Sequence, residues 1–164
     1  MSELIVVMGV SGSGKTTTGA ALARRLDVPF ADADDFHPPA NIAKMAAGTP
    51  LDDADRVPWL RAIADWLAAR PDGGVVTCSA LKRAFRDGLR AAAPNVRLVH
   101  LAGDPEVVRS RVAARPGHFM PVSLVASQFA ALEPLDPDEH GLVLDLDQPV
   151  DALVDAYLTA AEER

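Results

Sequence analysis

Glycines, a lysine and a hydroxyl residue follow one another closely near the start of the chain. Gly9 is followed by four residues and then by Gly14-Lys15-Thr16, which fits the pattern G-x-x-x-x-G-K-[ST] at every fixed position. Such glycines let the backbone wrap around a phosphate chain, with several N–H groups turned towards it at the positive end of the following helix. In this pattern the lysine reaches the β- and γ-phosphates, and the hydroxyl binds Mg²⁺. The spacing therefore predicts that the chain binds a nucleoside triphosphate.

The segments on both sides of this loop are the ones that it requires. An apolar run from Leu4 to Met8 predicts a strand before the loop, and helix formers from Ala20 to Leu26 predict a helix after it. The loop residues that we expect to contact the nucleotide are Gly9, Ser11, Gly12, Ser13, Gly14, Lys15, Thr16 and Thr17.

Two carboxylates follow the next strand-like run, which covers residues 28–31. Polar residues at the C-terminal end of a strand stand where α/β sheets bind ligands. Because strand side chains alternate with period two, we expect Asp32 and Asp34 to point to the same side of an extended segment. One of them could hold a Mg²⁺-bound water while the other orients an acceptor hydroxyl and takes its proton. A solvated acidic loop is the alternative interpretation.

Three arginines, Arg109, Arg111 and Arg115, lie within or at the end of one predicted helix, beside Pro116-Gly117. This arrangement is typical of a lid that brings arginines over the phosphates, and we expect the lid to cover roughly residues 109–131. Surface arginines that pair with nearby acidic residues are the alternative for each of them.

Composition and charge restrict the class of partner. The chain has 164 residues and a formal net charge of −7, which suits a single domain over residues 1–164. It has no run of basic residues, so we expect no nucleic-acid partner. No apolar stretch reaches the roughly 18 residues of a membrane-spanning helix, and we expect a cytoplasmic protein with no membrane partner. Cys78 is the only cysteine and is expected to be a small buried residue at a strand end.

Strands and helices are expected to alternate along the chain. The predicted strands cover residues 4–8, 28–31, 75–78, 96–101 and 142–146. The predicted helices lie at 20–26, at 40–47, from 55 up to Pro71, up to about residue 92, from Pro105 up to Arg115, at 123–132 and at 150–163. Such alternation predicts an α/β fold with a mostly parallel sheet that right-handed crossovers cover on both faces.

The surroundings of the loop favour a small-molecule kinase over other nucleotide-binding proteins. A GTPase would need a guanine-reading N/T-K-x-D, but none of the three lysines is followed two residues later by aspartate. A large motor or transporter ATPase would need a longer chain. A small-molecule kinase needs a phosphate cradle, a carboxylate beside the acceptor hydroxyl, an acceptor pocket and mobile cations, and this sequence has a candidate for each.

The sequence also resembles the gluconokinases of the shikimate-kinase-like P-loop group. The resemblance rests on residues 8–17, 32–60, 78–87, 117–135 and 145–151, which together cover roughly half of the chain in the family's order. It implies a P-loop kinase fold: a three-layer α/β/α sandwich with a five-stranded, mostly parallel sheet and a mobile lid. It also implies ATP- and Mg²⁺-dependent phosphorylation of D-gluconate at its 6-hydroxyl, and it suggests a homodimer.

The resemblance implies roles for individual residues. The expected catalytic residues are Lys15, Asp34 and Arg115, and the expected metal ligands are Thr16 and Asp32. Arg56 stands where these kinases hold the substrate carboxylate, which a planar guanidinium suits through paired hydrogen bonds. The full set expected at the substrate is Asp34, His37, Asn41, Lys44, Arg56, Lys82, Arg83 and His118, and the adenine is expected near Arg111, Gln148 and Pro149.

Several of these residues keep a second interpretation. Lys82 could equally form a surface salt bridge, and His118 could be a structural turn residue. Trp59 and Trp66, at helical spacing, are expected to belong to the core more than to a sugar-stacking platform.

Two positions depart from the family pattern. Ala33 stands where we expect glycine, and an alanine tolerates the extended backbone expected there. Pro116 stands where we expect a second basic residue, which predicts fewer lid cations and a stiffer lid closure, since proline lacks a donor and fixes φ.

Two other functions remain open at this point. One is a related kinase that acts on shikimate or a different sugar acid. The other is a nucleotide-dependent binding or regulatory protein with negligible turnover. Turnover with candidate acceptors distinguishes them, because a binding protein is stabilised by ATP but gains no turnover from any sugar acid.

Overall fold

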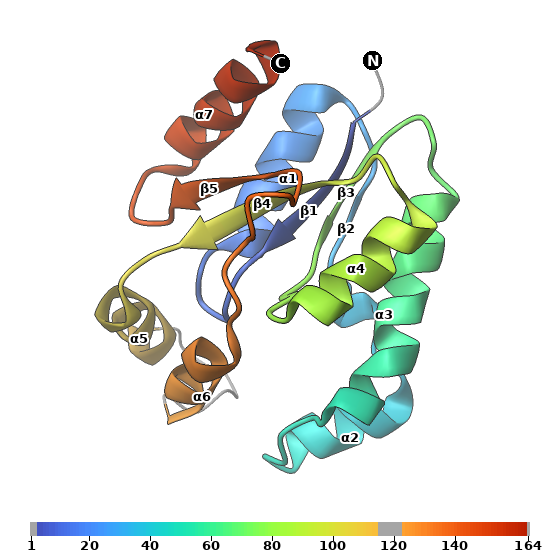
Figure 1. Ribbon diagram of the computed structural model, residues 1–164. Helices are drawn as coiled ribbons and strands as arrows, with labels where there is room; N and C mark the ends of the chain where they lie inside the picture. The colour runs from blue at the N-terminus through green and yellow to red at the C-terminus, as the bar shows by residue number, and fades with distance from the viewer. Residues whose placement is uncertain (1–2, 115–122, 164) are drawn as a thin grey trace.

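The computed structural model describes residues 3–114 and 123–163, and its strands form one sheet (Figure 1). The strands are β1 (Leu4–Met8), β2 (Phe30–Ala31), β3 (Gly74–Thr77), β4 (Arg97–Ala102) and β5 (Gly141–Asp145), in the order β2-β3-β1-β4-β5. All neighbouring strands pair in parallel, so the predicted five-stranded sheet is confirmed. Parallel pairing brings the C-terminal ends of the strands to one edge, where the candidate site residues are expected.

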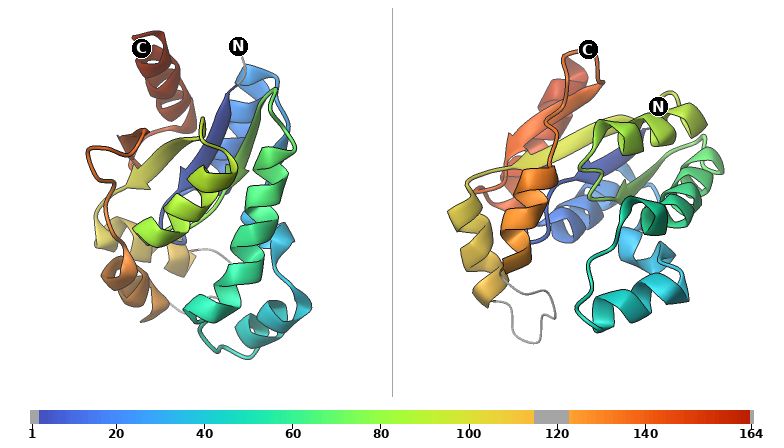
Figure 2. Two further views of the ribbon diagram at one scale, coloured as in Figure 1. Left: turned by 45° about the vertical axis from the view of Figure 1, so that its right-hand side comes forward. Right: turned by 60° about the horizontal axis from the view of Figure 1, so that its bottom comes forward.

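Helices cover both faces of the sheet and surround its C-terminal edge. They are α1 (Lys15–Leu26), the short 3₁₀ helix η1 (Ala33–Phe36), α2 (Pro39–Ala46), α3 (Asp53–Ala68), α4 (Arg83–Ala92), α5 (Pro105–Ala114), α6 (Ser123–Ala131) and α7 (Val150–Glu162). Helices α1 and α7 lie on one face, and α3 and α4 lie on the other. At the C-terminal edge, α5 and α6 stand on one side and α2 on the other (Figures 1 and 2). The predicted three-layer sandwich is therefore confirmed.

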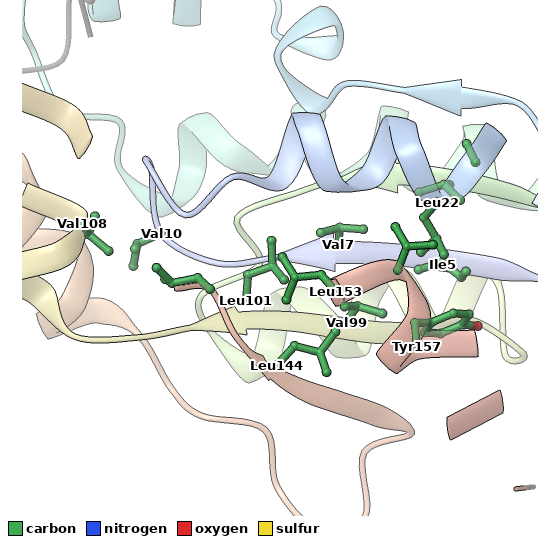
Figure 3. Close-up of a cluster of buried hydrophobic side chains, with 14 of the residues drawn as sticks. Ile5, Val7, Val10, Leu22, Val99, Leu101, Val108, Leu144, Leu153 and Tyr157 are labelled. Carbon is green, nitrogen blue, oxygen red and sulfur yellow. The ribbon is translucent and has the colours of Figure 1, made fainter. Parts of the chain in front are cut away.

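Strand β1 separates two apolar cores because its side chains alternate between the faces of the sheet. Ile5 and Val7 contribute to the core beneath α1 and α7, and Figure 3 draws them with Leu22 and Tyr157 of the same cluster. Val6 and Met8 contribute to the opposite core, together with residues of α3 and α4. All four β1 side chains are fully buried, so β1 runs through the centre of the molecule and delivers the glycine-rich loop to its middle.

The third helix begins two residues earlier than predicted because a capping box starts it. The Asp52 carboxylate accepts a hydrogen bond from the Asp55 N–H (2.7 Å), and the Asp55 carboxylate accepts one from the Asp52 N–H (3.0 Å). These reciprocal bonds satisfy two donors that the first turn of a helix leaves free. Helix α3 therefore begins at Asp53, whereas residue 55 was predicted as its start.

The prediction that Asp32 and Asp34 share an extended segment is wrong. Strand β2 ends at Ala31, and Asp32 caps η1, where its carboxylate accepts a hydrogen bond from the Asp34 N–H (3.0 Å). A short acidic side chain at this position competes with the strand by bonding to the backbone two residues ahead. Ala33 has no positive φ, and its N–H donates to the Thr77 hydroxyl (3.1 Å), so no glycine is needed here.

A buried ion pair fixes the segment between β3 and α4. Arg86 and Glu139 are paired through Nε and Oε1 (2.8 Å), and neither side chain is exposed. The Arg86 guanidinium also donates to the carbonyl oxygens of Ala80 (2.9 Å) and Leu81 (3.2 Å). Burial opposes the ionisation of Glu139, but hydrogen bonds, first those from Arg86, hold its pKa at about 2. Removing one partner of such a pair typically costs about 3–5 kcal/mol, because the other charge stays buried.

Cys78 is fully buried just beyond β3, as predicted, and burial raises the pKa of its thiol to about 12.

Among the helices of residues 3–114 and 123–163, none has both the length and the apolar composition needed to cross a bilayer.

Candidate functional site

A cavity of about 690 Å³ opens at the C-terminal edge of the sheet. It extends from the glycine-rich loop, over the end of β2 and the segment 33–37, to the connection between α2 and α3. Residues that were predicted for the site and that line it are Ser11, Gly12, Gly14, Lys15, Thr16, Thr17, Asp32, Asp34, His37, Arg56 and Arg111. The cavity thus places the predicted phosphate loop and both predicted carboxylates around a single space.

The glycine-rich loop ends in a helix start that has no side-chain cap. Gly14, the N-cap of α1, has φ 92°, a left-handed conformation that glycine adopts without strain. Because no side chain accepts from the first turn of α1, its N–H groups and the positive end of the helix are directed at the cavity. Lys15 Nζ donates to the carbonyl oxygens of Gly9 and Val10, each at 3.0 Å, which keeps its charge beside the loop. This combination can bind a chain of phosphates.

Not all predicted loop contacts face the cavity. Gly9 and Ser13 are buried and do not line it. Gly9 contributes through its close packing, since a Cβ atom there would lie 2.8 Å from Ser13 Oγ. The side chain of Ser13 and the close packing of Gly9 thus shape the loop from beneath.

The two residues predicted to bind metal are in contact. Thr16 Oγ1 donates to Asp32 Oδ2 at 2.7 Å, and Asp32 also accepts from the Thr77 hydroxyl through Oδ1 (3.4 Å). No group of three or more His, Cys, Asp or Glu side chains suited to a metal occurs in the part of the chain that the structure describes. One carboxylate and one hydroxyl beside a phosphate site still fit Mg²⁺, which keeps several waters and takes phosphate oxygens as ligands. The residues present therefore fit this ion.

Asp34 lines the cavity two residues after Asp32, and its N–H donates to the Asp32 carboxylate (3.0 Å). Burial raises the pKa of Asp34, and the nearby Asp32 carboxylate raises it further, whereas His37 and Lys15 lower it. A carboxylate with a raised pKa is a better proton acceptor than one in water. Asp34 therefore has the position and the electrostatics of a general base for a hydroxyl in the cavity.

His37 and Arg56 form the far wall, opposite the glycine-rich loop. The His37 ring stacks on Trp59 with 4.6 Å between ring centroids and 6° between the ring planes. Trp59 is buried, as predicted for a core residue, and its Nε1 donates to the Ala33 carbonyl oxygen (2.7 Å). Arg56 lines the cavity from α3 and lies 3.6 Å from Asp53. This wall offers a cation and an imidazole to an anionic, hydroxylated ligand.

Four residues predicted at the substrate do not line the cavity. Asn41 is buried and bonds to His37 and to the Asp55 carbonyl oxygen. Lys44 pairs with the Asp55 carboxylate (2.6 Å), which raises the pKa of Lys44. The other two also form ion pairs with protein carboxylates: Lys82 with Asp53 (2.9 Å), and Arg83 with Asp136 (2.8 Å) and Asp138 (2.7 Å). Because these three cations pair with nearby acidic residues and, unlike Arg56, do not line the cavity, we leave them out of the proposed substrate contacts.

The predicted adenine contacts are only partly brought together. Arg111 lines the cavity, and its Nη2 donates to the Leu146 carbonyl oxygen (2.9 Å) at the end of β5. Gln148 and Pro149 do not line it, and Gln148 Nε2 donates to the Asp145 carbonyl oxygen (2.9 Å). Arg115 and His118 lie outside the described residues.

The structure adds cavity residues that were not predicted as contacts of the nucleotide, the metal or the substrate. They are Ala33, Met45, Gly48, Thr49, Pro50, Leu51, Trp59, Thr77, Ser79, Ala114, Ser127 and Gln128. The most informative is Gln128 of α6, whose Oε1 accepts from the Ser11 N–H (2.6 Å) and whose Nε2 donates to Ser11 Oγ (3.2 Å). Gln128 belongs to a segment that carried the family resemblance, but no local pattern indicates that it contacts a loop 117 positions away.

Comparison with known proteins identifies the family. Residues 4–135 match the family model described as an AAA domain. The chain is 49% identical over 140 residues to the gluconokinase of Gluconobacter oxydans (strain 621H), covering 84% of this chain and 79% of that one. It is 46% identical over 144 residues to the thermosensitive gluconokinase of Escherichia coli (strain K12), covering 86% and 77%. The chain belongs to the gluconokinase family.

Solved structures agree with this family assignment. A gluconokinase from Sinorhizobium meliloti 1021 superposes with a TM-score of 0.91 at 45% identity, covering 98% of this chain and 92% of that one. A sugar kinase from Janibacter sp. HTCC2649 gives 0.92 at 52% identity, covering 99% and 95%. Shikimate kinase from Aquifex aeolicus gives 0.65 at 18% identity over 97% and 96%, which shows a shared fold. The resemblance inferred from the sequence is therefore confirmed for both gluconokinases and the shikimate-kinase-like fold.

Proposed function

We propose that this protein transfers the γ-phosphoryl group of ATP to the 6-hydroxyl of D-gluconate, giving 6-phosphogluconate and ADP. The observation that carries the proposal is that one cavity of this gluconokinase-family chain is lined by groups for both substrates. A phosphate loop with Lys15 forms one end, and Asp34 and Arg56 lie on the acceptor side. A kinase needs these groups around one space, because phosphoryl transfer depends on positioning and charge stabilisation more than on covalent chemistry by the protein.

At the phosphate end, backbone N–H groups and the positive end of α1 bind the phosphate chain. Lys15, held beside the loop by two carbonyl oxygens, spreads the charge that develops on the transferred phosphoryl group. Thr16 and Asp32 would hold Mg²⁺, which neutralises phosphate charge when bound. Arg111 stands at the rim of this end and supplies a further cation.

At the acceptor end, Asp34 orients the 6-hydroxyl of gluconate for in-line attack. The bond between the γ-phosphorus and the bridging oxygen of ADP breaks, the bond from phosphorus to O6 forms, and the O6 proton passes to the Asp34 carboxylate. Because bonding to the nucleophile is weak in a loose transition state, the orientation of O6 contributes more than removal of its proton. Arg56 binds the carboxylate at the opposite end of gluconate through paired hydrogen bonds.

Several features of this proposal rest on the sequence and the family resemblance alone. They are the dependence on Mg²⁺, the cytoplasmic location, the homodimer, the absence of nucleic-acid and membrane partners, and a lid over residues 109–131 that carries Arg115 and His118. Pro116, which stands where a second basic residue is expected, also falls within this predicted lid. Size-exclusion chromatography with light scattering measures the oligomeric state, and omission of Mg²⁺ from the assay tests the metal.

The proposed reaction is tested by measuring ADP release with Mg²⁺ and ATP in three parallel reactions, with D-gluconate, with shikimate and without an acceptor. We expect strong stimulation by gluconate alone. Stimulation by shikimate alone would move the assignment to another kinase with this fold. Binding of ATP without stimulation by either acceptor would contradict the proposed reaction and favour a nucleotide-dependent binding protein.

A further inference from the structure

The side-chain amide of Asn41 contacts two groups, and only one orientation of the amide makes a hydrogen bond with each of them. Asn41 lies in the first turn of α2 and is only 2% exposed. Its Nδ2 atom lies 2.9 Å from the backbone carbonyl oxygen of Asp55 in α3 and 3.2 Å from Nδ1 of His37. A carbonyl oxygen only accepts hydrogen bonds, so the amide group that faces Asp55 is the NH₂ group.

This contact determines which nitrogen of His37 carries the proton. An NH₂ group donates and does not accept, so His37 Nδ1 must accept the second hydrogen bond from Asn41. A neutral imidazole has one donor nitrogen and one acceptor nitrogen, and the proton of His37 is therefore on Nε2. The Asp55 carbonyl oxygen of α3 thus orients the Asn41 amide, and this amide in turn sets the tautomer of His37 in the cavity wall.

The plane of the His37 ring is fixed independently of its tautomer. The ring lies 4.6 Å from the Trp59 ring and almost parallel to it, at 6°. Trp59 is held in turn by the hydrogen bond from its Nε1 to the Ala33 carbonyl oxygen (2.7 Å). With Nδ1 occupied and the ring held flat against Trp59, Nε2–H is the polar group of His37 that remains for a ligand in the cavity.

We propose that Asn41 is a positioning residue that holds His37 as the neutral Nε2–H tautomer, so that His37 donates a hydrogen bond to an oxygen of the polyol acid. The proposal rests on the proposed function for the identity of that ligand. It gives His37 one role, that of a donor, whereas a freely turning imidazole could also accept from a hydroxyl. The cavity wall therefore selects for an acceptor oxygen at this position.

The charged groups around His37 come from three elements. Asp34 lies on η1, Arg56 and Asp55 on α3, and Lys44 on α2, where Lys44 and the Asp55 carboxylate are paired at 2.6 Å. Burial lowers the pKa of His37, and Arg56 lowers it further, whereas Asp34 opposes this. Protonation would also place a hydrogen on Nδ1 against the Asn41 N–H, so the doubly protonated ring loses this contact. His37 is thus neutral at pH 7, where it keeps its contact with Asn41.

The first test observes the tautomer directly in the full-length protein. In wild-type protein with ¹⁵N-labelled histidine, long-range ¹H–¹⁵N correlation spectra report which ring nitrogen bears the proton. We expect an unprotonated Nδ1 and a protonated Nε2 for His37 at pH 7, with His37→Gln used to assign the signals. A protonated Nδ1 would overturn the proposal, whether or not gluconate proves to be the substrate.

The second test links the tautomer to the acceptor. Asn41→Leu keeps the approximate size of the side chain but removes the donor, so that Nδ1 of His37 is no longer held as an acceptor and the ring can take either tautomer. We expect the KM for gluconate to rise a few-fold, up to about 10-fold, the worth of one hydrogen bond, while the KM for ATP stays unchanged. Its matched control is Ile42→Ala, an exposed neighbour on the same helix, which should leave both constants unchanged.

Two variants of His37 separate the donor from a structural role. In His37→Gln the side-chain amide can reach the place of Nε2–H and does not titrate, so it should keep the gluconate KM within a few-fold of wild type. His37→Ala should raise that KM about 10-fold, the worth of one hydrogen bond. Equal losses in both variants, or an unchanged gluconate KM in His37→Ala, would overturn the role of His37. If gluconate gives no turnover at all, the proposed function fails, and the tautomer measurement still decides the role of Asn41.

Discussion

The two ends of the cavity are built in different ways. At the phosphate end, consecutive residues from Gly9 to Thr17 form the binding loop, and their backbone N–H groups and the start of α1 do most of the binding. At the acceptor end, the groups that face the cavity are side chains of the segment 33–37 and of α3. His37 is held there by contacts with Asn41 of α2 and Trp59 of α3.

This difference teaches how much of each end a short sequence can specify. A backbone loop needs particular φ values and little else, so glycines at the right spacing define it. A side-chain wall needs the tertiary structure to fix rotamers, tautomers and ion pairs, so residue types alone leave its members undecided. Substitutions at the two ends should accordingly affect ATP and gluconate separately, and three predictions examine that separation.

The largest effect is expected for Asp34→Ala. Loss of the base that orients the 6-hydroxyl should reduce kcat by about 10²–10⁴-fold, the usual contribution of a general base. ATP affinity should stay close to wild type, because the phosphate loop is untouched. Steady-state kinetics together with ATP titration by calorimetry measure both quantities. Turnover near the wild-type rate would remove Asp34 from the mechanism.

The next effect in size is expected for Arg56→Ala. Removing a charge-assisted, paired hydrogen bond should raise the gluconate KM about 10–100-fold. The ATP KM should change far less, since Arg56 lies on the acceptor side of the cavity. Steady-state kinetics with each substrate varied in turn measure the KM for gluconate and the KM for ATP. An equal rise in the two would argue against a contact between Arg56 and the substrate carboxylate.

The smallest effect is expected for Gly12→Ala, which tests the phosphate end. Gly12 has φ +84°, and a Cβ atom there would lie 2.7 Å from Val112 Cγ2 of α5, so the loop must shift. We expect the ATP KM to rise about 10-fold, from overpacking of typically about 1–3 kcal/mol, with the gluconate KM little changed.

Gly48→Ala is the matched control for this variant. Gly48 also has a positive φ (+76°), but a Cβ atom there would meet no atom within 4 Å. Both variants carry the backbone strain, and only Gly12→Ala carries the clash. Equal ATP KM values in the two variants would show that the packing of the loop against α5 is unimportant.

The fold was predictable to a large extent because its signals are local. The five apolar runs, the phosphate loop and the acidic end of β2 specified an α/β sandwich with the site at the C-terminal edge of the sheet. The errors lie where side chains compete with the backbone. Asp32 starts a 3₁₀ helix by capping it, and Asp52 starts α3 early through a capping box.

The candidate site was predictable only in part. Lys15, Thr16, Asp32, Asp34 and Arg56 were predicted for it and line one cavity. Lys82 and Arg83 were also predicted, but each pairs with carboxylates 29 to 55 positions away in the sequence. Whether a surface cation is free for a ligand depends on which acidic residues the fold brings beside it, and no spacing rule contains that information.

The sequence by itself determined the phosphate loop, the family and the order of strands and helices, because these depend on residue types at fixed short spacing. Only the tertiary structure decided how the acceptor end is arranged. It placed Gln128 on the Ser11 backbone, stacked His37 on Trp59 and directed the amide of Asn41 at the Asp55 carbonyl oxygen. The physical reason is that a side chain's orientation is set by the donors, acceptors and rings that surround it, and folding brings these together from distant parts of the chain.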